Sequence, residues 1–316
     1  MRTVFFAFAA ALVAVALSVG PSNAASSSPL VLGNWAARSM YLDPSGMAHM
    51  NQSAVHKRPP LQHNLVNFNV HNLALSDASS GAVRVYNTYG VQTQYITNRV
   101  SCPDGLTYDN KGDLYVTNYC LSQNTVVEYN PGQVNAAWVY SAGLFNPVNV
   151  STDKNDNVYV AGFLSGTVTE FAHRTNAVLH QCSAGGYVEG ITIDGAGDVF
   201  VSYGNNLVEY KGGLAGCSQT PLSPTLGFAG GLILDKPGNL LAEDQFGGVD
   251  VIPPPYTTIK TTIAAFCGPF HEALSGPGNL LFVTDDCVSA YALTYPHDFF
   301  YAPLSGYGAA FGIASD

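Results

Sequence analysis

The sequence predicts an all-β protein, a six-bladed β-propeller whose ring is closed by a strand at the C-terminus. Three observations lead to this prediction: a repeated unit of strands and turns, an incomplete repeat at each end, and a composition that suits short strands. The 316 residues include 32 Gly and 18 Pro, and only 11% are charged. With Val, Tyr, Phe and Thr, this mixture is typical of many short strands joined by tight turns.

The repeated unit is an apolar strand, a turn of the type Asp-x-x-Gly-Asp/Asn, and a second apolar strand. It occurs five times, and the residues that open the turns are spaced 44, 41, 41 and 40 apart: Asp109, Asp153, Asp194, Asp235 and Ser275. Gly and Asn accept the positive φ that such hairpin turns require. A third apolar strand follows each turn at a steady offset, as at residues 126–129. Self-similarity at a fixed period indicates a repeat architecture.

The two ends of the chain bring the count of blades to six. Residues 73–87 resemble a second and a third strand without a first one, and residues 311–316 resemble a first strand with nothing after it. We therefore expect the C-terminal strand to complete the blade that the N-terminal strands begin. A ring closed in this way has no free sheet edge between its first and last blades. The alternative, an open β-solenoid, does not need a split repeat.

The segment before the repeats has the features of an export signal. Met1-Arg2 is followed by an apolar run from Val4 to Val19, and Ser22-Asn23-Ala24 offers a cleavage site. An uncleaved anchor is the alternative, but the run is shorter than the ~20 residues that span a bilayer. We predict a signal peptide at residues 1–24, a flexible leader at 25–64 and the propeller at 65–316. The protein is then secreted or periplasmic, without a membrane span after cleavage.

The charge of the chain limits its partners. The formal net charge is −10, and no Lys/Arg cluster is larger than Lys57-Arg58. Because such a protein repels phosphate backbones, nucleic acid is excluded as a partner. We expect a monomer.

Six cysteines in an exported chain favour disulfides over free thiols. Two pairs flank a turn at the same two blade positions, and the first strand begins on the face where the second strand ends, so each pair can meet. We predict three disulfides: Cys102–Cys120, Cys267–Cys287 and, by elimination, Cys182–Cys217. The absence of a C-x-x-C motif makes a metal site at these cysteines the weaker interpretation.

The repeat pattern resembles NHL repeats and the gluconolactonase/senescence-marker family of six-bladed propellers, over residues 65–316. Pro103-Asp104-Gly105 is the closest local match. The resemblance implies a divalent cation, calcium, in the central channel, with Asp104, Glu189 and Asn149 as its ligands. Residues 277–282 also resemble the repeats of streptogramin lyases, which implies a catalytic histidine, and His271 is the candidate.

The residues five positions before each turn enter the innermost strands and are expected to ring one mouth of the channel. They are Asp104, Val148, Glu189, Gly230, Phe270 and Phe311. Three of them are apolar, which leaves the shell of a hard cation incomplete, since such ions take about six oxygen ligands. Each polar candidate has a simpler interpretation: Asp104 caps a turn, channel water hydrates Glu189, and His271-Glu272 is a surface pair.

Three functions are compatible with these residues. The first is a recognition module that binds a protein, peptide or glycan on the face that carries Tyr119, Phe163, Tyr203 and Phe246. The alternatives are a metal-dependent lactonase-like hydrolase and a lyase acting on a cyclic ester. Because the metal shell looks incomplete, the sequence favours the recognition module. His271 and Glu189 are the candidates for a catalytic role if the protein is an enzyme.

Overall fold

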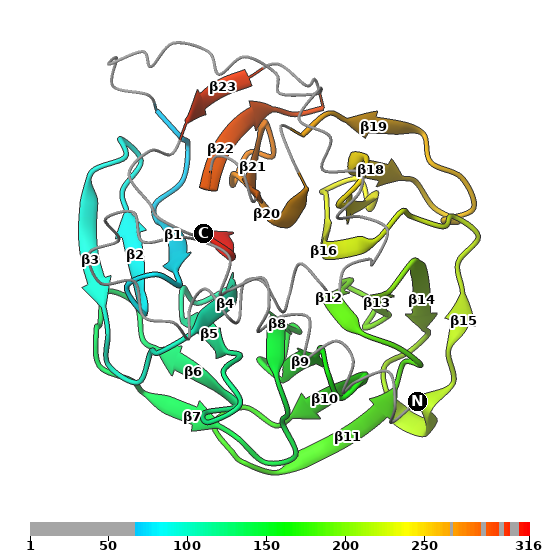
Figure 1. Ribbon diagram of the computed structural model, residues 1–316, viewed down its shortest axis with the longest axis horizontal. Coiled ribbons are helices and arrows are strands. Elements are labelled where there is room, and N and C mark those ends of the chain that lie inside the picture. The colour runs from blue at the N-terminus through cyan, green and yellow to red at the C-terminus, as the bar shows by residue number, and fades with distance from the viewer. Residues whose placement is uncertain (1–66, 266–267, 286–288, 297–299, 304–309) are drawn as a thin grey trace, which may run out of the picture. The chain divides into compact units, whose positions relative to one another are not determined.

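A computed structural model describes residues 67–265, 268–285, 289–296, 300–303 and 310–316. Within this part of the chain, six four-stranded antiparallel sheets stand around a central channel (Figure 1). This is the predicted six-bladed β-propeller. The predicted signal peptide (1–24), the leader (25–64) and the Cys267–Cys287 disulfide lie outside the described residues.

The strands of each blade follow one another from the channel outwards. Blade 1 contains β24 (Ile313–Ser315), β1 (Leu73–Asp77), β2 (Ala82–Tyr86) and β3 (Gln92–Ile96). Blade 2 contains β4 (Pro103–Tyr108), β5 (Leu114–Asn118), β6 (Thr125–Tyr129) and β7 (Trp138–Tyr140). Blade 3 contains β8 (Pro147–Thr152), β9 (Val158–Gly162), β10 (Thr167–Phe171) and β11 (Val178–Ser183).

The second half of the ring has the same order. Blade 4 contains β12 (Val188–Ile193), β13 (Val199–Tyr203), β14 (Asn206–Tyr210) and β15 (Thr220–Pro221), with the short 3₁₀ helix η2 (Ala215–Cys217) before its last strand. Blade 5 contains β16 (Ala229–Leu234), β17 (Leu240–Asp244), β18 (Gly248–Ile252) and β19 (Thr261–Ile263). Blade 6 contains β20 (Pro269–Leu274), β21 (Leu280–Asp285), β22 (Ser289–Thr294) and β23 (Phe300–Pro303).

The predicted turn residues hold the hairpins between the first and second strands. Asp109 accepts hydrogen bonds from the backbone N–H groups of Lys111 (2.8 Å) and Asp113 (2.9 Å). Asp153, Asp194 and Asp235 bond the matching N–H groups of their own turns. These aspartates therefore stabilise the backbone of the turns, as expected of residues that recur with the repeat.

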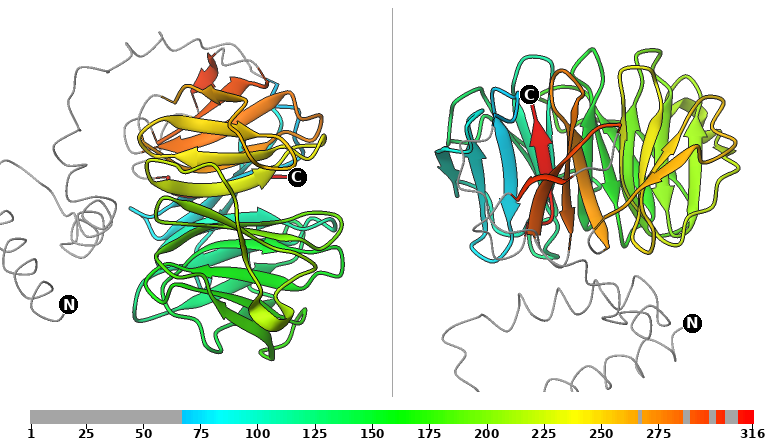
Figure 2. Two further views of the ribbon diagram at one scale, coloured as in Figure 1. Left: turned by 90° about the vertical axis from the view of Figure 1, so that its right-hand side faces the viewer. Right: turned by 90° about the horizontal axis from the view of Figure 1, so that it is seen from above.

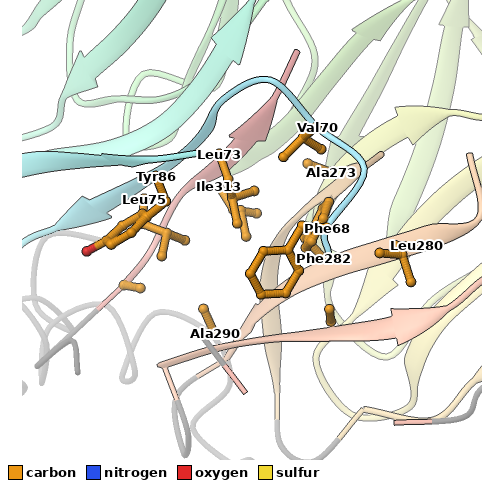
Figure 3. Close-up of a cluster of buried hydrophobic side chains, with 12 residues drawn as sticks. Phe68, Val70, Leu73, Leu75, Tyr86, Ala273, Leu280, Phe282, Ala290 and Ile313 are labelled. Atoms are coloured by element: carbon orange, nitrogen blue, oxygen red, sulfur yellow. The ribbon is translucent and has the colours of Figure 1, made fainter. Parts of the chain in front are cut away.

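The C-terminal strand closes the ring as predicted. β24 pairs antiparallel with β1, with Leu73 opposite Ser315 and Leu75 opposite Ile313 (Figure 2). The backbone N–H of Ser76 donates to the carbonyl of Gly312 at 3.0 Å, which extends the pairing by one residue. Apolar side chains from both ends of the chain pack together beside this strand with side chains of blade 6 (Figure 3): Phe68, Val70, Leu73, Leu75, Ile313, Leu280 and Phe282. Closure thus depends on a shared core as well as on backbone hydrogen bonds.

Two of the three predicted disulfides lie among the described residues, and both are present. Cys102–Cys120 connects the two ends of the β4–β5 hairpin, with its Cα atoms 5.6 Å apart. Cys182–Cys217 joins β11 of blade 3 to η2 of blade 4, with its Cα atoms 5.4 Å apart. No helix in the described part of the chain is long and apolar enough to cross a membrane.

Candidate functional site

The inner strands approach one another closely where they enter the channel. A Cβ atom on Gly105 would lie 2.4 Å from the carbonyl oxygen of Val148 in the next blade, and one on Gly312 would lie 1.8 Å from that of Asp104. Only glycine fits at such contacts. The glycines that recur in the inner strands therefore narrow the ring and bring side chains of different blades together.

Each of five inner strands carries a register irregularity at this level. It falls between Pro103 and Leu106 in β4, and at the matching positions of β8, β12, β16 and β20. A β-bulge places an extra residue opposite its partner strand and redirects the neighbouring side chains. This explains why residues at two successive positions, such as Asp104 in β4 and Asn149 in β8, both reach the channel site.

Hydroxyl groups from the second strands hold the bulged backbone in four blades. Ser202 of β13 donates to the carbonyl of Gly230 (2.6 Å) and accepts from the N–H of Gly190 (2.7 Å). Ser76, Thr117 and Thr284 occupy the same position in blades 1, 2 and 6. Ser76 accepts from the N–H of Gly312, Thr117 donates to the carbonyl of Gly105, and Thr284 donates to the carbonyl of Phe311. Blades 3 and 5 have Ala161 and Glu243 there. Glu243 is thus the exception in a layer of small side chains.

Three of the sequence-predicted site residues meet across the channel. His271 of β20 lies between Asp104 of β4 and Asn149 of β8, with Nε2 3.3 Å from Asp104 Oδ1 and Nδ1 3.1 Å from Asn149 Nδ2. All three are buried. Because the amide of Asn149 donates to Nδ1, the proton of the neutral imidazole is on Nε2, which faces Asp104. The interpretation of His271-Glu272 as a surface pair is wrong, since only 4% of His271 and 5% of Glu272 are exposed.

Beside this trio lies a pair of buried carboxyl groups, Glu243 of β17 and Glu272 of β20. They face each other across Gly231 of β16: a Cβ atom there would lie 2.7 Å from Glu272 Oε2 and 3.2 Å from Glu243 Oε2. The N–H of Gly231 donates to Glu243 Oε2 at 3.1 Å. Glu243 can reach this place because Gly230 and Gly231 have no side chains in front of it.

Burial changes the protonation of both groups. Desolvation raises the pKa of Glu272 to about 8. Desolvation also raises the pKa of Glu243 well above its ordinary value, and the negative charges of Glu272 and Glu189 raise it further. The predicted ligand Glu189, which is 1% exposed, therefore acts electrostatically on Glu243.

A cavity of about 290 Å³ occupies the channel and is lined by the inner strands of all six blades. Asn149, His271 and Glu272 belong to its wall. In a propeller blade the innermost strand pairs on one side alone, so its other edge presents backbone N–H and C=O groups to the channel. The cavity therefore combines a polar wall with ionisable groups.

Aromatic side chains surround the channel on the face where the inner strands begin. Phe270 and Phe311 contact each other, with ring centroids 5.5 Å apart, and Tyr119 packs against Phe311 at 6.3 Å. Phe163 is stacked on Tyr187 at 5.0 Å. Phe270 and Phe311, which were expected to make the channel mouth apolar, are buried and pack against other aromatic rings. The neighbouring His271 enters the site instead. Among the aromatic residues predicted for this face, Phe246 is the most open, with 51% exposed.

A second ionisable cluster lies away from the channel. Asp113, Glu128 and His173 have ligand atoms within 4.8 Å of one another, and they form the one such group of three among the described residues. The guanidinium of Arg174 lies 2.7 Å from Glu128 and 3.6 Å from Asp113. Its positive charge offsets part of the negative charge of the two acids, and these contacts join blades 2 and 3.

Sequence reasoning found Asp104, Asn149, Glu189 and His271 but missed Glu243. The missed residue lies on a second strand, outside the set of inner-strand positions that was compared. An alignment of the second strands would have revealed a glutamate where four repeats have Ser or Thr.

The fold and the site define this protein as a six-bladed β-propeller with a polar, acid-containing central channel. Compared with models of protein families and with curated proteins, the chain matches none.

Proposed function

We propose that the protein is an exported recognition module that binds a neutral, hydroxyl-rich ligand, such as a glycan, at the aromatic mouth of its channel. The observation that carries this proposal is the combination of aromatic side chains with convergent polar groups on one face. Ligand sites commonly pair apolar and aromatic walls with a few polar groups that fix orientation.

The charges favour a neutral ligand over an anionic one. Asp104, Glu189, Glu243 and Glu272 gather around the channel, and the chain carries a net charge of −10. This field repels anions, while carboxylate and amide oxygens accept hydrogen bonds from hydroxyl groups.

Two features support export. The disulfides Cys102–Cys120 and Cys182–Cys217 fit an oxidising compartment. The apolar run and small residues of the first 24 positions fit a cleaved signal peptide. Sequencing the N-terminus of the protein recovered from the medium or periplasm tests this: we expect it to begin at Ala25, and a retained Met1 contradicts export by cleavage.

The recognition proposal is tested by measuring melting temperatures against a panel of neutral oligosaccharides and then titrating any hit. We expect Phe246→Ala and Asp104→Asn to weaken binding by about tenfold or more, because central aromatic and polar groups carry most of a binding energy. Trp138→Ala, on the outer strand β7, is the matched control and leaves affinity unchanged. Binding that resists both site substitutions, or that falls equally in the control, contradicts the proposal.

A metal-dependent lactone hydrolase is the second candidate, because Asp104 and Asn149 come together at His271. Their oxygens are donors that suit a hard divalent cation, and Asp104, Asn149 and Glu189 would hold it. A bound cation would polarise the lactone carbonyl. His271 would move a proton at Nε2, where Asp104 orients the ring.

Product analysis separates this hydrolase from a lyase that uses the same histidine. Hydrolysis adds water across the ester bond, whereas elimination removes a proton and leaves a carbon–carbon double bond. For either enzyme we expect Asp104→Asn and His271→Gln to lose turnover of a lactone panel. Full turnover in both variants contradicts a catalytic role for this channel.

A further inference from the structure

The carboxyl group of Glu272 has unused acceptors in the wall of the channel cavity. It is close enough to the carboxyl of Glu243 and to the backbone of Ile233 and of Glu272 itself for these groups to affect its pKa, but neither of its oxygens has a hydrogen-bond partner of normal geometry. Oε1 of Glu243 is likewise without a partner. Glu272 is 5% exposed and Glu243 is fully buried. Buried polar groups are normally satisfied, so three open acceptor atoms together indicate a binding partner.

The neighbours of this pair increase its negative potential. Glu189 acts on Glu243 from blade 4, and Asp104 lies beside His271, the residue before Glu272. Two adjacent buried carboxyl groups cannot both be ionised without a compensating positive charge. A cation is the partner that would let both groups be ionised at once.

The backbone around the pair is arranged to leave space for both carboxyl groups. Gly230 and Gly231 have no side chains, and a Cβ atom on Gly231 would meet both glutamates. At the position of Glu243, four other blades have a Ser or Thr that only binds backbone. The glutamate departs from this pattern in the one blade whose inner strand has two successive glycines at the bulge.

We propose that Glu243 and Glu272 bind a hydrated divalent cation in the channel cavity. This goes beyond the proposed function and uses neither Asp104 nor Asn149, which face His271. Both oxygens of Glu272 and Oε1 of Glu243 are available as ligands. Ca²⁺ and Mg²⁺ take oxygen ligands and complete their shells with water. Because a water molecule occupies about 30 Å³, the 290 Å³ cavity holds the ion with several waters.

The experiment measures the melting temperature of the full chain, freed of metal by a chelator, against Ca²⁺ and Mg²⁺ at constant ionic strength. We expect at least one ion to raise the melting temperature of the wild type. Glu243→Gln and Glu272→Gln, which keep the size of the side chains, should lose this shift. Asp104→Asn should retain it, as should Glu209→Gln, a carboxylate on the third strand of blade 4.

Calorimetric titration gives a second readout, with an expected stoichiometry of one ion per chain. If one glutamine variant folds poorly, Gly231→Ala replaces it in this titration. The added Cβ atom would displace both carboxyl groups and abolish the binding isotherm. The proposal is overturned if neither ion binds the wild type, or if the shift survives in both glutamine variants. A shift lost in Asp104→Asn but not in Glu243→Gln also overturns it and assigns the ion to the ligands that the family resemblance implies.

Discussion

Blades 4 and 5 share the repeat but place different side chains behind the bulge of the inner strand. In blade 4, Ser202 bridges Gly190 and Gly230, so the side chain joins two neighbouring blades through their backbones. In blade 5, Glu243 accepts one backbone hydrogen bond, from Gly231, and meets Glu272 of the next blade. The same position therefore stabilises the ring in one blade and creates an ionisable site in the other. The two roles differ because the short side chain of Ser202 ends at the backbone groups that it bonds, whereas the longer side chain of Glu243 extends past the backbone.

The largest effect on stability is expected when the residue types of Ser202 and Glu243 are exchanged. Ser202→Glu places a carboxylate between Gly190 and Gly230, next to Glu189 and without a cationic partner. We expect it to lower the free energy of unfolding by more than about 3 kcal/mol, as uncompensated buried charges do. Chemical denaturation measures this loss. The reciprocal Glu243→Ser is expected to be mild, because it restores the residue type found in the other blades, and equal effects of the two substitutions contradict the distinction.

The pH dependence of stability sharpens the comparison in blade 5. The pKa values of Glu243 and Glu272 are raised in the folded protein, with Glu272 at about 8, so the folded state binds more protons than the unfolded state above the ordinary carboxyl pKa of 4.5. The stability that this pair contributes is therefore fully present below pH 4.5 and is lost as the pH rises toward 8, by at most about 1.4 kcal/mol per pH unit for one proton.

This is measured in the presence of a chelator, since a bound cation would mask the loss. The charge of Glu189 also acts on Glu243 and contributes to the profile. The contribution of the pair is the part of the slope that Glu243→Gln removes. A profile that is identical in wild type and Glu243→Gln contradicts the raised pKa values.

Removing the hydroxyl of blade 4 has a smaller expected effect. Ser202→Ala leaves the carbonyl of Gly230 and the N–H of Gly190 without this partner in a buried place. We expect a loss of about 1–3 kcal/mol in the free energy of unfolding. Ser165→Ala, on a partly exposed turn, is the control with little effect. A wild-type unfolding midpoint in Ser202→Ala would mean that the hydroxyl layer does not join the blades.

The turns and the split repeat made the fold predictable, because Asp109 and its equivalents act locally and recur at a fixed period. Asp104 and Asn149 were predictable as inner-strand residues for the same reason. The bulge in β20 was not, since its signature is a change of register between Pro269 and His271 rather than a residue type. It turns His271 into the channel and leaves Phe270 against Phe311. The role of Glu243 depends on this geometry and on Gly231, which only the assembled ring brings together.

The smallest effect is expected where the hydroxyl is naturally missing. Ala161 of blade 3 occupies the position of Ser202, between the bulge of β8 and the inner strand of blade 4. By analogy with blade 4, a serine there would accept from the N–H of Asn149 and donate to the carbonyl of Glu189. Ala161→Ser should therefore raise the free energy of unfolding by about 0.5–1.5 kcal/mol, the net value of an added hydrogen bond. Ala161→Val, which adds volume without a donor, is the matched variant and should destabilise by overpacking. Denaturation midpoints decide the matter: if serine and valine destabilise alike, the site is simply too tight for any larger residue, and the bulge of blade 3 does not need the hydroxyl that its neighbours have.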